Sequence, residues 1–247
     1  MTSTAAHPTS PTAPAPTITV RIWRVPSARV PIALGNMAWG RLALRRQPGV
    51  TFAKLLGTGS GQTFTVTDAD VHRWALLTVS DTPAAAATLA DSRLVRAWEA
   101  IAAESLQIQL RTLSSRGEWS GRRPFPSATP QRWDGPVAAI TRARIKPSAW
   151  PTFWSSVPPV AADLRERPGV LLSLGIGEAP VGLQGTFSMW EHNKALTAFA
   201  QRGAPHRAVI AETARRNWYA EELFARFAVI RCQGTFAGAA VLPAGPS

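Results

Sequence analysis

The chain of 247 residues, 45% hydrophobic and 17% charged, has the ordinary balance of a globular protein with a substantial core. No apolar run approaches the ~18 residues that a membrane-spanning helix needs, and a single cysteine, Cys232, excludes an intrachain disulfide. The net charge is +12, but the arginines are scattered and no stacking-aromatic motif accompanies them, so nucleic acid is not an expected partner.

The first half of the chain alternates between strand and helix patterns. Residues 1–17 consist largely of Ala, Pro, Thr and Ser, which predicts a disordered N-terminal tail and not a secretory signal. Beyond the tail, alternating or continuous apolar runs predict strands, and apolar residues at helical spacing predict helices. The strands are expected at 17–25, 50–56, 74–79 and 106–113, and the helices at 31–46 and 82–104.

A glycine-rich run, Gly57-Thr58-Gly59-Ser60-Gly61, follows the second of these strands. It is a poor match to a phosphate-binding loop, because no Lys-Ser/Thr pair follows its last glycine and Thr63–Val66 has the pattern of an extended segment. It also lacks the third spacing of a dinucleotide-binding fingerprint, because Gly61 comes one position too early for GxGxxG. We expect a hairpin turn or a turn at the edge of a cavity.

The same order of elements returns in the second half. Strands are expected at 137–145, 170–176, 185–190 and 225–232, and helices at 150–167 and 194–217. Pro158-Pro159 breaks the first of these helices, and Gly203 with Pro205 interrupts the second.

Local echoes indicate that the two halves are copies of one unit. RQPGVTFAKLLGTG, in the 45–59 region, matches RPGVLLSLGIGE (167–178), and SRGEWSG (115–121) matches CQGTFAG (232–238). We therefore expect an α+β fold of two βαββαβ units, whose sheets bury their open faces against each other and enclose a cavity. The expected divisions are a tail (1–17), a first repeat (18–121), a Pro-rich linker (122–136), a second repeat (137–240) and a C-terminal tail (241–247).

The histidines are the residues from which a metal or haem site is best argued. One cysteine and four scattered histidines offer neither CxxC nor HExxH, so no zinc motif exists, and no GxSxG nucleophile elbow is present. A haem needs only one axial side chain. His206 follows Pro205, as at the start of a helix, and shares its face with Val209 and Ile210. A buried core histidine and an iron ligand both fit this pattern.

Several long blocks resemble the spheroidene monooxygenase family. They are LGNMAWGRLALRRQPGVTFAKLLGTGSGQTF (34–64), SSRGEWSGRRPF (114–125), AAITRARIKP (138–147), GIGEAPVGLQGTFSMW (175–190) and PHRAVIAETARRNWYAEELFARF (205–227). In the same order as in the family, these blocks cover nearly all of residues 18–240. The resemblance implies two tandem ferredoxin-like repeats packed as an intramolecular dimeric α/β-barrel that binds haem b. It also implies that His206, which matches the family's histidine, is the ligand of the iron.

Two of the matched blocks contain charged residues suited to a site. Lys54 shares strand parity with the apolar Phe52 and Leu56, so it requires either an anion, such as a haem propionate, or an edge position in solvent. Arg226 follows Phe224 in FARF, where propionate pairing and a plain surface charge are both open.

Polar and aromatic residues complete the expected site. Gln184 and Ser188 are expected near a distal ligand, since Ser188 shares strand parity with Thr186 and one face of that strand is then polar. Trp39, Phe187 and Trp190 are expected to shape a flat-ligand pocket, although aromatic residues at such spacing also serve as plain core.

The resemblance implies a haem-dependent monooxygenase that oxygenates a carotenoid, or a similar hydrophobic substrate, with O₂ and reduced ferredoxin. Haem proteins of the same fold also dehydrate aldoximes or carry ligands, so these alternatives stay open. We expect a cytoplasmic protein, with peripheral contact to a membrane surface where a lipid-soluble substrate resides.

Overall fold

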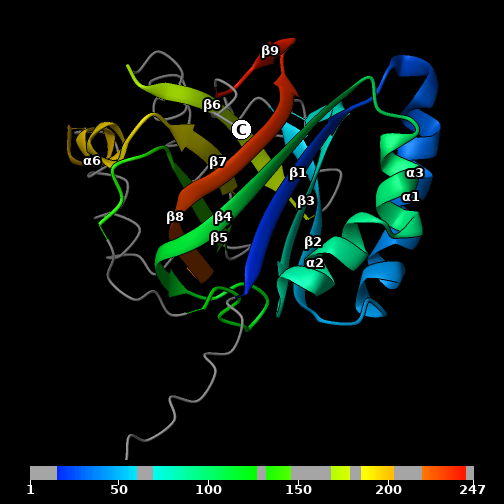
Figure 1. Cartoon of the computed structure of the whole chain (residues 1–247), viewed down its shortest axis with the longest axis horizontal. Coiled ribbons are helices and arrows are strands. Elements are labelled where there is room, and N and C mark those ends of the chain that lie inside the picture. The colour runs from blue at the N-terminus through cyan, green and yellow to red at the C-terminus, as the bar shows by residue number, and fades with distance from the viewer. Residues whose placement is uncertain are drawn as a thin grey trace, which may run out of the picture.

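The computed structural model describes residues 16–59, 69–126, 132–145, 168–178, 185–202 and 219–242. The elements of the first half are β1 (Thr17–Arg24), the 3-10 helix η1 (Ser27–Arg29), α1 (Val30–Arg45), β2 (Val50–Gly59), β3 (Ala69–Ser80), α2 (Pro83–Ala90), α3 (Arg93–Glu99) and β4 (Glu104–Gly117). Those of the second half are β5 (Val137–Ile145), β6 (Val170–Gly177), β7 (Gly185–Trp190), α6 (Asn193–Arg202), β8 (Tyr219–Phe236) and β9 (Ala239–Ala240). Figure 1 shows α1, α2 and α3 together on one side of the strands and α6 on the opposite side.

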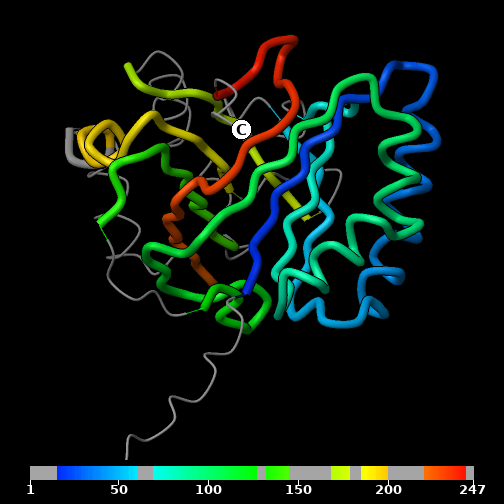
Figure 2. The backbone as a smooth tube through the Cα atoms, viewed as in Figure 1, coloured from blue at the N-terminus to red at the C-terminus, as the bar shows by residue number. Residues whose placement is uncertain are grey.

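The strands β1 to β8 form one antiparallel sheet that closes on itself. The first half contributes the order β4-β1-β3-β2, and the second half contributes the corresponding order β8-β5-β7-β6. β2 pairs with β6 at one seam and β4 pairs with β8 at the other, so the two sheets form a barrel, which can be followed along the tube in Figure 2. The predicted architecture, two ferredoxin-like repeats packed as one α/β-barrel, is confirmed.

The two halves have the same backbone geometry at the open end of one strand pair, β2–β3 in the first half and β6–β7 in the second. Gly49 and Gly169 both have positive φ, 70° and 84°. Each accepts a 2.9 Å hydrogen bond through its carbonyl oxygen, from the backbone N–H of Asp81 and of Glu191 respectively. The strand pairing then shifts register directly after the first residue of β2, Val50, and directly after the first residue of β6, Val170. These matches support the duplication from geometry alone.

A second repeated feature lies at the ends of β4 and β8. The echo between residues 115–121 and 232–238 corresponds to the same backbone path, with positive φ at Gly117, Ser120 and Gly121 and at the equivalent Gly234, Ala237 and Gly238. A Cβ at Gly117 would lie 2.1 Å from the Glu222 carbonyl oxygen, so the close approach of the two strands requires glycine there.

The barrel interior is filled with apolar side chains. Alternate residues of each strand point inward and form one buried cluster, to which Phe52, Trp119, Phe187 and Phe227 contribute rings. Within the described part of the chain, the void among these side chains is about 10 Å³, at the limit of what one water molecule occupies. Among the described residues, large inward side chains occupy the space between the two sheets, so the structure does not show the cavity that the sequence predicted there.

The outer face of the first half is covered by helices. Trp23, Trp74 and Leu76 from the strands pack against α1, α2 and α3 in a second buried cluster. Trp23 stacks on Trp98 of α3 at 5.2 Å between ring centroids, with an interplanar angle of 8°. The hydrophobic faces of these short helices are thus satisfied by tertiary packing.

The structure differs from the predicted elements at four places. The glycine run is strand rather than turn as far as Gly59, since β2 pairs there with both β3 and β6. The expected helix 82–104 is two helices, because α2 ends at Ala90 with Asp91 as its C-cap and Ser92 then caps the start of α3. The last strand, β8, is far longer than the predicted 225–232, because its first part pairs with β5 and the pairing with β4 continues beyond it. The linker begins with a buried Phe125, whose ring packs against Phe227 at 4.8 Å.

Other predictions concern segments outside the described residues. These segments are the helix at 150–167, the second part of the helix at 194–217, and most of each tail. Among the described residues, none of the helices has the length and apolar character to span a bilayer.

Candidate functional site

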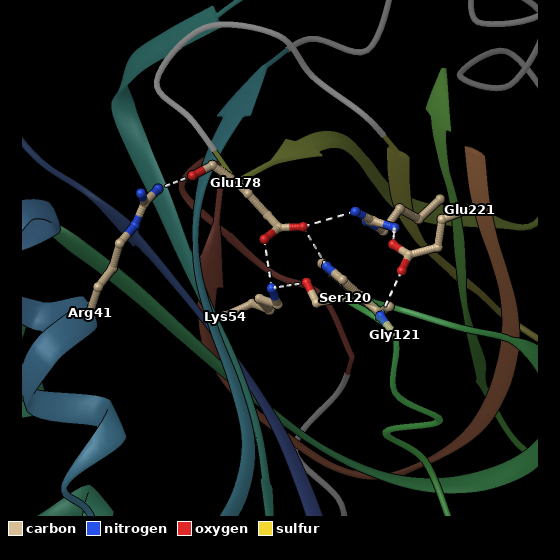
Figure 3. Close-up of polar contacts among 8 residues, drawn as sticks. Arg41, Lys54, Ser120, Gly121, Glu178 and Glu221 are labelled. Carbon is tan, nitrogen blue, oxygen red and sulfur yellow. Dashed lines mark hydrogen bonds and ion pairs between the residues drawn. The ribbon is translucent and has the colours of Figure 1, made fainter. Parts of the chain in front are cut away.

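An ion-pair network occupies one end of the barrel, drawn in Figure 3. Lys54 Nζ of β2 donates to Glu178 Oε2 at 2.6 Å, and Arg142 Nη2 of β5 donates to Glu178 Oε1 at 2.9 Å. Arg142 also pairs with Glu221 of β8. The Arg142 side chain is 2% exposed, so its charge relies on these two carboxylates for compensation. The network links the two halves across the barrel end.

The loop after β4 closes this end of the barrel. Trp119 Nε1 donates to Glu178 Oε1 at 2.6 Å, and Ser120 Oγ accepts from Lys54 Nζ at the same distance. The backbone N–H of Gly121 donates to Glu221 Oε1 at 2.7 Å. From outside, the Arg41 guanidinium of α1 donates to the backbone oxygen of Glu178. Glu178, the first residue after β6, therefore has hydrogen-bond partners in both halves of the chain.

The electrostatics keep both carboxylates of the network charged. Burial acts to raise the pKa of Glu178, but hydrogen bonds from Lys54 and Trp119, with the charges of Lys54 and Arg142, outweigh it and leave the pKa below its ordinary value. For Glu221, hydrogen bonds from Gly121 and from Arg142 likewise lower the pKa against the effect of burial. Ionised and fully paired carboxylates are poor proton donors, so this network is suited to holding structure rather than to acid catalysis.

The sequence analysis missed most of this network. It identified Lys54 and placed it correctly on the face of Phe52 and Leu56, and the anion that Lys54 requires is the Glu178 carboxylate. The inward position of Arg142 could have been predicted, because strand parity puts it on the same face as the inward Ala138 and Ile140. Glu178 and Glu221 had no such sequence signal, since their partners come from distant segments.

A different surface, the outer face of the second sheet, gathers other expected site residues. Register places Ser173, Ser188, Ala139 and Arg226 side by side in one row across β6, β7, β5 and β8. The neighbouring row is Gly175, Thr186, Thr141 and Phe224. We call these two rows the small-residue face, because six of the eight side chains are Gly, Ala, Ser or Thr.

Aromatic and basic groups border the small-residue face. Trp190, at the end of β7, is fully buried and donates from Nε1 to Ser188 Oγ at 3.0 Å. Its ring lies 5.4 Å from that of Phe199 of α6, at an interplanar angle of 37°. Arg226 is exposed and donates to Ser114 Oγ at 3.0 Å and to Asn193 Oδ1 at 3.4 Å. One edge of the face is thus aromatic and another carries a positive charge.

A surface pocket of about 350 Å³ opens where α6 begins. It is lined by Pro168, Gly169, Glu191, His192, Lys194, Ala195, Ala198 and Phe199. His192 is not free at this point, because its Nδ1 accepts the backbone N–H of Ala195 at 3.0 Å and caps the helix. The pocket shares Phe199 with the aromatic edge of the small-residue face.

The remaining expected site residues are not brought together. Phe187 lies inside the barrel, on the opposite face of β7 from Ser188 and Trp190. Trp39 is on α1 in the first half, where its Nε1 donates to Asn36 Oδ1 at 3.1 Å. His206 and Gln184 lie outside the described residues. The described residues bring together no group of three potential metal ligands.

Three proteins named spheroidene monooxygenase are similar to the chain over most of its length. The protein of Rhodobacter capsulatus is 37% identical over 216 residues, which is 86% of this chain and 89% of that protein. The protein of Rubrivivax gelatinosus is 35% identical over 213 residues, covering 86% and 81%. The protein of Cereibacter sphaeroides is 33% identical over 207 residues, covering 83% and 64%. No family model matches the chain.

Among solved structures, an aldoxime dehydratase has a similar fold. It superposes with a TM-score of 0.55 at 12% identity, over 87% of this chain and 81% of that one. A second aldoxime dehydratase, in complex with butyraldoxime, gives a TM-score of 0.52 at 10% identity over 87% and 79%. At such low identity these likenesses concern the fold alone.

Proposed function

The chain belongs to the spheroidene monooxygenase family, and we propose that it oxygenates a carotenoid or a similarly extended hydrophobic molecule with the help of haem b. As a member of this family it is an oxidoreductase of the monooxygenase type. The proposal adds O₂ as the co-substrate and reduced ferredoxin as the electron donor. It also includes a cytoplasmic location and peripheral contact with a membrane, where such a substrate would dissolve.

One observation supports the position of the haem: in one row of the small-residue face, the row of Gly175 and Thr186, the second half has smaller side chains than the first half. Leu55 in the first half is equivalent to Gly175 in the second, and its strand neighbour Leu76 is equivalent to Thr186. At these two positions the first half has leucine side chains that pack on helices, whereas the second half has a glycine and a threonine. A sheet covered by small side chains leaves space for a flat ligand between it and the next layer.

The alternative position, inside the barrel, does not suit a haem. The interior void of about 10 Å³ is far below the few hundred Å³ that a ligand of this class requires. The outer face fits better, since it combines small side chains, the Trp190–Phe199 aromatic edge and the cationic Arg226. We assign Arg226 to a propionate, Trp190 to an edge of the macrocycle, and His206 to the iron.

When bound, the haem would supply the activation of O₂. The chain's residues would hold the macrocycle, keep His206 neutral and exclude water. Ser188 is fixed by Trp190 on the small-residue face, and Gln184 belongs to the segment that leads into β7. We assign these two residues to the substrate side. Lys54 is paired with Glu178 at the barrel end, Phe187 packs inside the barrel, and Trp39 packs in the helix layer of the first half. We therefore propose that these three residues stabilise the structure around the site and do not contact the haem.

An absorption spectrum tests the assignment. The protein isolated from haem-supplemented cells should show a Soret band, and His206→Ala should abolish or shift it. His72→Ala is the matched control, because His72 lies on β3 of the first half and contacts the Val25 carbonyl oxygen. A spectrum that is unchanged in His206→Ala, or equally changed in both variants, would reject His206 as the ligand.

Turnover distinguishes this function from others on the same fold. Ferrous protein with reduced ferredoxin and O₂ should convert a carotenoid, with one atom of O₂ entering the product. Anaerobic conversion of an aldoxime to a nitrile, without carotenoid turnover, would replace the proposal with the dehydratase alternative. Haem binding without either reaction would indicate a carrier.

A further inference from the structure

Helix α1 has an apolar ridge on the side that faces away from the barrel. Its inward residues, including Ala33, Met37 and Leu44, are buried against the first sheet. Leu34, Ala38 and Leu42 recur every four residues and therefore form one line on the outward side. Leu34 is 45% exposed and Leu42 is 58% exposed, whereas Ile32, which is 44% exposed, lies on another flank of the helix. Two leucine side chains, eight residues apart, are thus left in water on this side, with Ala38 between them.

Basic residues lie at both ends of the ridge, and its own segment of the chain contains no acidic residue. Arg45 and Arg46 are exposed at the C-terminal end of α1, and Arg29 is exposed just before its start. The sequence has no Asp or Glu between Val25 and Gly49. This surface therefore combines an apolar line with basic edges, within a chain whose net charge is +12.

We propose that the outward side of α1 docks on an anionic lipid membrane. A helix that lies in the interface of a bilayer places apolar side chains at the boundary of the acyl chains and arginines beside the phosphates. The long arginine stems reach the headgroups while the ridge is immersed. An acidic protein partner would match the charge, but it would give no reason for the aliphatic ridge between the arginines.

The position of α1 suits this role. Figure 1 shows the helix at the outer margin of the molecule, on the opposite side of the strands from α6. Arg41 of α1 bonds to the backbone oxygen of Glu178, so the helix is connected to the end of β6 in the second half. The inference names the surface behind the proposed membrane contact, and it does not depend on the haem.

Co-sedimentation of the full chain with lipid vesicles tests the docking surface. Vesicles of phosphatidylcholine containing phosphatidylglycerol should bind the protein, and phosphatidylcholine alone should bind it far more weakly. The variant Leu34→Ser/Leu42→Ser should reduce the partition coefficient by about tenfold or more. Arg45→Ser/Arg46→Ser should reduce it by roughly tenfold and weaken its dependence on salt.

The matched control is Val71→Ser/Ile230→Ser, which removes two aliphatic side chains that are 47% and 44% exposed on strands. It should bind vesicles as the wild type does, and circular dichroism should show that all variants are folded. Absence of binding to anionic vesicles, or equal loss in the ridge and control variants, would overturn the proposal. So would a wild-type dimer that becomes monomeric in the ridge variant, because a second copy would then be the partner. Each readout is independent of haem content.

Discussion

The two halves share one backbone plan but use the outer faces of their sheets differently. In the first half, that face and its helices form a closed apolar layer around Trp23, Trp74 and Trp98. In the second half, Gly175 and Thr186 stand where the first half has Leu55 and Leu76, so this row of the outer face carries smaller side chains. After a duplication, one copy can maintain stability while the other gives up packing for a ligand. The difference between the halves therefore indicates where to look for function.

The largest expected effect is on the first half. Trp23→Ala should lower the free energy of unfolding by about 3–5 kcal/mol, because it removes a fully buried ring stacked on Trp98. It should leave haem affinity per folded molecule unchanged. Urea denaturation gives the first quantity and haem titration the second. A loss below about 1 kcal/mol would mean that the first layer is not the stabilising one.

A second prediction concerns Arg142, which stands where the first half has Ile22. Arg142→Ile should cost about 2–3 kcal/mol, less than the usual loss of a buried pair, because Lys54 still compensates Glu178. Urea denaturation of this variant and of Arg144→Ile, an exposed arginine on the same strand, measures the difference. Equal stability of the two variants would show that the network contributes nothing.

The network also predicts a pH dependence. The folded-state pKa of Glu178 and of Glu221 is lowered, so each contributes stability that is present above its unfolded-state pKa and is lost as the pH falls through its folded-state pKa. The free energy of unfolding should decline in mild acid, and Glu178→Gln/Glu221→Gln should flatten that decline while lowering stability at neutral pH. An unaltered acid slope in the double variant would contradict the lowered pKa values.

Filling the small-residue face should convert it toward its first-half counterpart. Thr186→Leu introduces the side chain that Leu76 has in the other sheet, and it should weaken haem binding about tenfold or more by occupying the proposed site. Thr88→Leu, at an exposed position of α2, is the control and should have no effect. Haem titration followed at the Soret band measures both. Unchanged affinity in Thr186→Leu would move the haem away from this face.

The smallest expected effect compares the two helix caps. Ala85 N–H donates to Thr82 Oγ1 at 3.1 Å in the first half, and Ala195 N–H donates to His192 Nδ1 at 3.0 Å in the second. Thr82→Ala and His192→Ala should each cost about 1 kcal/mol, while His192→Thr should restore most of the loss. Thermal denaturation of the three variants checks this. No loss in His192→Ala would show that the second cap is not needed.

The repeat, the order of the strands along the chain and the face of each inward residue could be predicted from the sequence. These properties depend on local patterns, such as the period of two that puts Lys54 beside Phe52 and Leu56. Errors arose where pairing with distant segments decided the outcome. Gly57–Gly59 is strand because β6 pairs with it, and β8 is long because β4 offers a partner along its length.

The candidate site divides in the same way. His206, Ser188 and Arg226 were proposed from residue type and resemblance, and register then placed Ser188 and Arg226 in one row, while His206 lies outside the described residues. Phe187 and Trp190 are three residues apart but lie on opposite faces of β7, a separation that follows from strand geometry.

The duplicated α+β plan, the family resemblance and the residue types available for a site could all be inferred from the amino-acid sequence. The three-dimensional structure was needed to see that the described barrel interior is packed, that Glu178 joins Lys54 to Arg142, and that the second sheet has a small-residue face. The physical reason is that repetition and parity are local properties of the chain. Closure of a barrel, compensation of a buried charge and the space above a sheet depend on which distant segments meet.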